Sequence, residues 1–366
     1  DFYSDDWGTY YSVRGQHLDA LGQQTWAPTG VSVAGSCADY SDQLVSDNQG
    51  GAFLLCKAQT GGYTAGIFAQ RILASGELAW DLWDGLIVSS TYLRGTLAAD
   101  GLGGCLVGYY RKDINSETGY ISVKRLGADG TSLWDYGTGV ASSKERLDGP
   151  VIYSTEDHGA LVGWSERIGS DSQAFAQKIA PTGERLWGSS GVAVCTASSD
   201  QIIDGVRPHD LGGAIVFWGD DRNGGPGIYA QGLDPDGAVK WPATGVPVLL
   251  NTPDFYELAA CPDDDGGVIL AVRDFDFGLS DIFSQRLNRR GTLGALEPVV
   301  VEVSDVPEDE GGWVQVHWYA SAGDVMPASD IARYGLWRYR EGMEDWELTG
   351  EIPAGGQDYY EAMIPT

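Results

Sequence analysis

The feature that most constrains the fold is an internal repeat of about 54 residues. Its clearest marker is a glycine followed four positions later by a tryptophan, as in Gly76 and Trp80, and successive markers are spaced by 54, 54, 53 and 54 residues. The five pairs are Gly22/Trp26, Gly76/Trp80, Gly130/Trp134, Gly183/Trp187 and Gly237/Trp241. A fixed period of this length indicates one structural unit used several times.

Two further columns keep the same period. A glutamine lies six residues before each marker glycine, as Gln70 does before Gly76, with Lys124 in its place in one copy. A Gly-Gly pair, such as Gly212-Gly213, opens an apolar run in most copies. Residues that recur in every unit solve a packing problem that all units share, so we expect function where the copies differ.

Each unit reads as four short strands separated by turns rich in Asp, Asn and Gly. In the segment IFAQRIL, apolar side chains fall on both faces, with Ile67 and Ala69 on one and Phe68 and Ile72 on the other. Strands covered on both faces fit small sheets stacked radially around an axis. The sequence therefore predicts an all-β chain folded as a β-propeller of four-stranded blades, with another repeat fold as the alternative.

The repeat also predicts the domain boundaries. Five complete units run approximately from residue 40 to residue 303, and residues 1–36 supply only the later half of another unit. We therefore expect a propeller over residues 1–303 with an incomplete first blade, and six or seven blades in the intact ring. Unpaired strand edges in that first blade lead us to expect self-assembly there with a neighbouring molecule.

Residues 304–366 follow the repeats and differ from them. The segment WVQVHWY, residues 313–319, alternates polar and apolar side chains with a period of two, which is typical of a strand. This part of the chain resembles the beginning of a fibronectin type III-like β-sandwich. It is shorter than the roughly 100 residues of a full immunoglobulin-like sandwich, so we expect a truncated domain.

The segment GGAIVFWGDDRNGGPGIYAQGLDPDGAVKW, residues 212–241, resembles the tandem repeats of large secreted bacterial proteins. The resemblance implies a propeller on an exported, often multidomain protein, and it brings no catalytic residues with it. The D-x-x-G-x-x-x-W element is also similar to the repeat of quinoprotein dehydrogenase propellers and to the Asp-box of sialidases, where it is structural. Because Asp1 lies inside a repeat, we expect a processed chain or a piece of a longer one.

Composition excludes some partners. The net charge of −29 repels phosphate backbones and anionic headgroups, so nucleic acid is not an expected partner. No apolar run approaches the ~20 residues of a membrane-spanning helix. The odd number of cysteines allows at most two disulfides, and no CxxC pair suggests a metal cage. We expect an extracellular or cell-surface location.

Candidate site residues are few. Asp263, Asp264 and Asp265 depart from the repeat, and clustered carboxylates on a turn can hold Ca²⁺, with a solvated acidic turn as the alternative. No other cofactor is indicated. We predict no catalytic residues, because the four histidines lie in repeat strands or turns and neither a G-x-S-x-G nor a P-loop pattern is present.

These observations favour a non-catalytic protein that binds or scaffolds outside the cell. A propeller presents loops on a rigid body, which suits recognition of a protein or a polysaccharide, or packing into a surface assembly. The alternative is a carbohydrate-active or quinone-dependent enzyme on the same fold. Two neighbouring carboxylates at the central axis would favour that alternative.

Overall fold

The computed structural model describes residues 2–5, 8–37, 43–60, 64–80, 86–90, 92–112, 115–134, 137–209, 212–222, 224–250, 255–263, 265–276, 279–294, 298–307, 311–324, 331–339 and 346–365. The chain divides into two compact units, one of Asp1–Leu258 with Arg273–Asp281 and one of Ala259–Val272 with Ile282–Thr366. Within the described ranges, no helix is long and apolar enough to cross a membrane.

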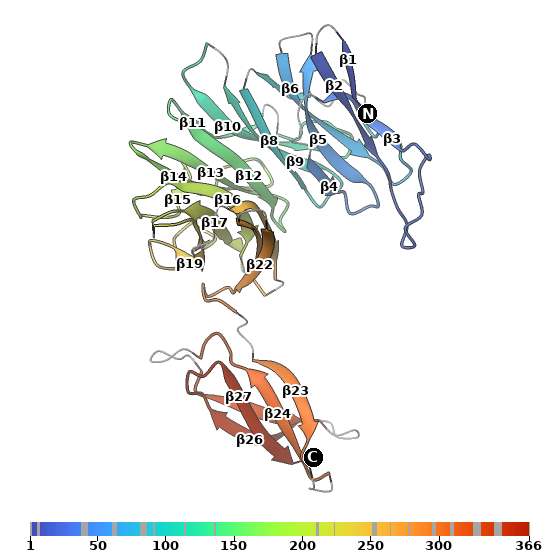
Figure 1. Cartoon of the computed structure of the whole chain (residues 1–366). Helices are drawn as coiled ribbons and strands as arrows, with labels where there is room; N and C mark the ends of the chain where they lie inside the picture. The colour runs from blue at the N-terminus through green and yellow to red at the C-terminus, as the bar shows by residue number, and fades with distance from the viewer. Residues whose placement is uncertain are drawn as a thin grey trace. The chain divides into compact units, whose positions relative to one another are not determined.

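The repeats fold into antiparallel sheets that follow one another in chain order (Figure 1). The sheets with four strands are β4 (Gln43–Ser46), β5 (Ala52–Thr60), β6 (Thr64–Ile72) and β7 (Leu86–Ser90); β8 (Tyr92–Ala99), β9 (Cys105–Lys112), β10 (Gly119–Leu126) and β11 (Thr138–Ser143); β12 (Leu147–Ser154), β13 (Ala160–Ile168), β14 (Asp171–Ile179) and β15 (Val192–Ala193); and β16 (Gln201–Pro208), β17 (Ala214–Asp220), β18 (Gly227–Leu233) and β19 (Val246–Leu250).

In chain order, one sheet of three described strands precedes these four and another follows them. The first holds β1 (Phe2–Asp5), β2 (Gly8–Gly15) and β3 (Val31–Cys37), one strand more than the two we expected from residues 1–36. The last repeat holds β20 (Phe255–Pro262), β21 (Val268–Asp276) and β22 (Leu279–Leu287). Self-assembly through the first sheet and the boundary at residue 303 stay predictions.

The first strands of successive four-stranded sheets contact one another, β4 with β8, β8 with β12 and β12 with β16. Sheets that meet along their first strands and splay apart outward form the blades of a propeller. The strands behind them are covered on both faces, and every residue of β17 and β18 is buried. The predicted all-β propeller with four-stranded blades is confirmed.

The marker tryptophan joins one blade to the next. Trp80 donates its indole N–H to the carbonyl of Ala128, 3.0 Å away, and its ring lies on Gly130 of the following unit. A Cβ atom added at Gly130 would lie 2.9 Å from Trp80 Cγ. Trp26, Trp134 and Trp187 make the same bond and the same glycine contact. The Gly-x-x-x-Trp period therefore records contacts between neighbouring blades.

The glutamine column fixes the segment that carries the tryptophan. Gln177 is fully buried, donates to the carbonyl of Gly188 at 2.9 Å and accepts the N–H of Trp187 at 2.8 Å. A buried amide that satisfies two backbone groups at once is costly to replace. The same pair of bonds is made by Gln16, Gln70 and Gln231 in their own units.

The C-terminal segment contains two further sheets. One has the order β23 (Val299–Asp305), β24 (Trp313–Tyr319) and β27 (Tyr359–Pro365), and the other pairs β25 (Arg333–Arg338) with β26 (Glu347–Pro353). Trp318, Tyr334 and Tyr360 form the centre of its core. In β24 Val316 and Trp318 are buried and both end residues are exposed, so the predicted alternation is confirmed.

Four cysteines have described side chains, and none of the four forms a disulfide. Cys56, Cys105 and Cys195 are buried, and Cys261 is exposed. Burial raises the pKa of the Cys105 thiol far above its ordinary value, so this side chain is held as an uncharged thiol. It packs as a small hydrophobic group in the core cluster around Trp80.

Candidate active site

An aspartate–arginine ion pair recurs in the blades and explains the acidic turn at residue 263. Arg71 contacts Asp47 at 2.9 Å, and both side chains are almost completely buried. Arg125 with Asp100, at 3.0 Å, and Arg286 with Asp263, at 2.8 Å, occupy the same place in their units. In each pair the carboxylate also accepts backbone N–H groups of its own turn.

Asp263 is thus a repeated structural position rather than a departure from the repeat. Burial acts to raise its pKa, but Arg286 and two backbone N–H groups outweigh burial and hold the pKa below its ordinary value. Asp265 pairs with Arg289, and Asp264 lies outside the described residues. A calcium ion here would compete with these arginines. Calcium binding by Asp263, Asp264 and Asp265 stays a prediction.

Some charged residues are not shared by all copies of the repeat, and several of these lie on the first strands of the blades. Asp148 in β12 accepts a hydrogen bond from Arg94 Nη1 of the preceding blade at 2.9 Å and pairs with Arg146 Nε at 2.6 Å. Its side chain is 10% exposed, whereas those of the two arginines are 60% and 64% exposed. Two arginines therefore reach from solvent to a carboxyl group that is nearly buried.

Tyr110 in β9 lies within electrostatic reach of this group. Burial raises the pKa of its hydroxyl, the charge of Arg94 lowers that pKa, and the charge of Asp148 raises it. The hydroxyl is therefore a neutral donor or acceptor at physiological pH. A tyrosine, two arginines and a carboxylate make a polar group that the repeat itself does not require.

Asp204 in β16 is the second carboxyl group. The pairing of β16 with β17 shifts between Ile203 and Gly205, and the carboxyl of Asp204 accepts the N–H of Gly219 beside this bulge. Its Oδ2 atom is buried and has no hydrogen-bond partner in the described part of the chain. Burial raises the pKa of Asp204 to about 7, and the bond from Gly219 opposes that rise. Asp204 therefore holds a proton close to neutral pH.

Asp148 and Asp204 lie at the same level of neighbouring first strands. Asp148 is paired across its sheet with Ser165, and the Ser165 hydroxyl accepts the N–H of Ile203 at 2.8 Å. Ile203 directly precedes Asp204, so one residue links the two positions. The sequence did carry a signal, because a charged residue precedes glycine in three successive first strands, at Arg94, Asp148 and Asp204. Sequence reasoning missed it.

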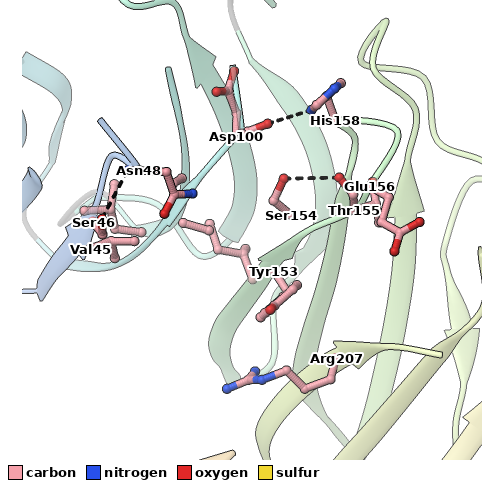
Figure 2. A pocket seen from close by; sticks show the side chains of 15 residues that line it. Val45, Ser46, Asn48, Asp100, Tyr153, Ser154, Thr155, Glu156, His158 and Arg207 are labelled. Carbon is pink, nitrogen blue, oxygen red and sulfur yellow. Dashed lines mark hydrogen bonds between the residues drawn. The ribbon is translucent and has the colours of Figure 1, made fainter. Parts of the chain in front are cut away.

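A cavity of about 530 Å³ lies at the other end of the first strands (Figure 2). Its walls come from the ends of β4, β8, β12 and β16 and from the turns that follow the first three of them. His158 and Asp100 meet at its edge, where His158 Nδ1 lies 2.9 Å from the Asp100 carbonyl oxygen. In β12 the cavity thus lies at the opposite end from Asp148.

The sequence matches no family model and no curated protein. Solved structures that are similar to the chain include an alpha-L-arabinanase of Penicillium chrysogenum complexed with arabinobiose, at 10% identity and a TM-score of 0.43 over 84% of this chain and 93% of that one. Polysaccharide lyase Uly1 is 12% identical, with a TM-score of 0.45 over 96% and 94%. An endo-arabinase of Bacteroides thetaiotaomicron is 12% identical, with a TM-score of 0.36 over 66% and 92%.

These comparisons contradict the expectation of a non-catalytic binding or scaffolding protein. The similar structures named above are enzymes that act on carbohydrates, as is an alpha-L-arabinofuranosidase of Fusarium graminearum at 8% identity. The expectation failed because the catalytic candidates lie in different repeats. Acidic residues are numerous in this chain, so no pair of them could be singled out before the strands were placed.

Proposed function

We propose that this chain is a carbohydrate-active enzyme that cleaves a polysaccharide, with Asp204 and Asp148 as its two reacting carboxyl groups. The observation that carries the proposal is Asp204 itself, a buried carboxyl with an unpaired oxygen and a pKa raised to about 7. On the neighbouring first strand, Asp148 forms ion pairs with Arg94 and Arg146. Glycoside cleavage uses two carboxyl groups, one of which must carry a proton to give to the leaving oxygen.

In this reaction Asp204 donates its proton to the glycosidic oxygen as the bond to the sugar carbon breaks. Asp148 supplies the second carboxylate, which either takes a proton from the attacking water or bonds to the sugar carbon. Arg94 and Arg146 hold Asp148 in place through their ion pairs, and Tyr110 offers a neutral hydroxyl to the sugar. Because Asp204 loses its proton near pH 7, activity should fall as the pH rises through that value.

Release of reducing ends from arabinan, galactan, xylan and mannan tests the proposal. We expect Asp204→Asn to lower kcat about 10²-fold or more, since it removes the proton donor, and Asp148→Asn to have an effect of similar size. Asp236→Asn, at an exposed turn, is the matched control and should leave the rate unchanged. Equal rates in wild type and Asp204→Asn would refute the assignment, as would no cleavage of any of the four polymers.

We further propose that the enzyme works outside the cell, with a polysaccharide as its partner. The repeat resemblance to large secreted bacterial proteins and the net charge of −29 support this location. Residues 304–366 are proposed to be a fibronectin type III-like module, supported by the two small sheets that share the Trp318, Tyr334 and Tyr360 core. Detection of the protein in culture medium rather than in cell lysate tests the location.

A further inference from the structure

The cavity at the turn end of the first strands is separate from Asp148. In β12, Asp148 is the second residue, whereas Tyr153 and Ser154, which line the cavity, are the last two. Because β12 bulges after Asp148, Asp148 and Tyr153 face Ser165 and Leu161, four residues apart on β13, which is roughly 13 Å of strand. A ligand in this cavity therefore occupies a site that the cleavage chemistry does not use.

The wall of the cavity combines an apolar surface with a polar edge. Val45, Leu97 and Ile152 contribute aliphatic groups from three successive blades, and Tyr153 adds an aromatic ring. The Arg207 guanidinium lies 5.0 Å from the centre of that ring and also contacts Phe217, which limits the freedom of the ring. Rigid aromatic surface of this kind binds a ligand at low entropic cost.

The polar edge uses two residues in an unusual backbone conformation. In the described part of the chain, the residues other than glycine with positive φ are Asn48, at 58°, and His158, at 64°, and both line the cavity. The turn of the blade between them has glycine at both places, Gly101 for Asn48 and Gly103 for His158, each with positive φ. A side chain in this conformation costs about 1 kcal/mol where glycine has no such cost, and Asn and His adopt it more readily than most residues.

His158 is held in a fixed orientation at the cavity. Its Nδ1 bonds to the carbonyl of Asp100 on the neighbouring blade, and its ring lies over Gly101, where an added Cβ would be 3.3 Å from Nδ1. Nε2 makes no hydrogen bond to the described residues. Asn48 contributes an amide from the β4 side, and Figure 2 shows it across the cavity from Tyr153. Together they place a hydrogen-bonding nitrogen and an amide beside an aromatic ring.

We propose that this cavity is a second saccharide-binding site, distinct from the site of cleavage. A sugar presents an apolar C–H face and an edge of hydroxyls, so its face fits Tyr153 and the aliphatic wall while its hydroxyls meet Asn48 and His158. The carboxylate of Glu156 at the edge disfavours a phosphorylated or other anionic ligand. Asp100 is already occupied by Arg125, and the described residues form no metal-binding cluster.

Calorimetric titration with arabinotriose, galactotriose, xylotriose and mannotriose tests this proposal. It is carried out in Asp148→Asn/Asp204→Asn protein, so that no probe is cleaved. We expect at least one probe to bind, Tyr153→Ala to weaken its binding 10-fold or more, and His158→Gly and Asn48→Gly to weaken it several-fold each. The two glycine variants restore the residue that other copies carry, so their melting temperatures should be unchanged or higher.

The result that would overturn the proposal is binding that these three variants leave unaltered, or no binding of any probe at millimolar concentration. The Glu77→Gln variant, at an exposed turn that does not line the cavity, is the control that should bind as the parent does. Cleavage and binding are read separately. A protein that cleaves polysaccharide without binding at Tyr153 refutes the second site alone, and one that binds there without cleaving refutes the enzyme alone.

Discussion

Asp204 is a carboxylic acid whose charged form the fold opposes. It lies on a strand where the ladder is broken by a bulge, and one of its oxygens accepts the N–H of Gly219. The other oxygen is buried and has no hydrogen-bond partner among the described residues. A protein accepts such a group at a cost in stability, which is why buried carboxyls with raised pKa values point to function.

The pH dependence of stability tests the protonation state of Asp204. Its pKa is about 7 in the folded chain and about 3.9 when unfolded, so between these values the folded state binds more protons. Stability should therefore fall as the pH rises from 4 to 7, by roughly 4 kcal/mol from this residue, and then level off. Urea unfolding at pH 4, 5.5, 7 and 8 measures it.

Asp204→Asn is the comparison for this measurement. The amide does not ionise, so the variant should gain stability relative to wild type at pH 8 and show little or no gain at pH 4. Wild type and variant share every other titrating group, so their difference isolates Asp204. If the two curves run parallel from pH 4 to pH 8, Asp204 is ionised throughout and cannot act as the proton donor.

At the scale of elements, blades are joined by a tryptophan ring laid on a glycine turn. Trp80 on Gly130, Trp134 on Gly183 and Trp187 on Gly237 repeat one arrangement. The glycine serves two purposes there. Its positive φ closes the turn, and its missing side chain lets the ring of the preceding blade approach to van der Waals contact.

The first repeat provides a matched control for this contact. Gly22 has φ of 76° and no atom within 4 Å of an added Cβ, whereas Gly130 has φ of 82° and faces Trp80. Gly22→Ala should cost about 1 kcal/mol for backbone strain alone. Gly130→Ala should cost a further 1–3 kcal/mol, since the ring must move. Thermal and urea unfolding measure the difference, and equal losses would show that the ring contact contributes nothing.

At the scale of the whole molecule, charge is the dominant property. With 52 acidic and 23 basic residues, the chain carries a net charge of −29, and the buried aspartate–arginine pairs use only a few of the arginines. The remaining acidic surface repels itself, which destabilises the compact state at low ionic strength. Exposed charges are screened within about 10 Å at 0.1 M salt, and buried pairs much less.

Raising the NaCl concentration from 0.02 M to 0.3 M should therefore raise the melting temperature. The same change made with choline chloride should have an equal effect, because screening does not depend on the cation. A rise with calcium chloride well beyond that of magnesium chloride at matched ionic strength would instead support the predicted Ca²⁺ site. A melting temperature that falls with salt would show that attractive ion pairs outweigh the repulsion.

The sequence by itself determined the repeat, the strand pattern and the all-β propeller. Each blade must receive the tryptophan of the one before it and hold its own with a buried glutamine, so Gly76, Trp80 and Gln70 recur at one period. Such contacts impose the same residue at the same place in every copy. The residues that mark the repeat in the sequence are therefore the same residues that make the contacts within and between blades.

Only the tertiary structure decided which strands lie side by side. Asp148 and Asp204 stand 56 positions apart in the chain, and the fold places them on the neighbouring first strands β12 and β16, which are linked through Ser165 and Ile203. The burial that gives Asp204 its raised pKa comes from the packing of whole blades, as does the cavity beside Tyr153. The residue pattern of one strand does not specify which strand will pack beside it.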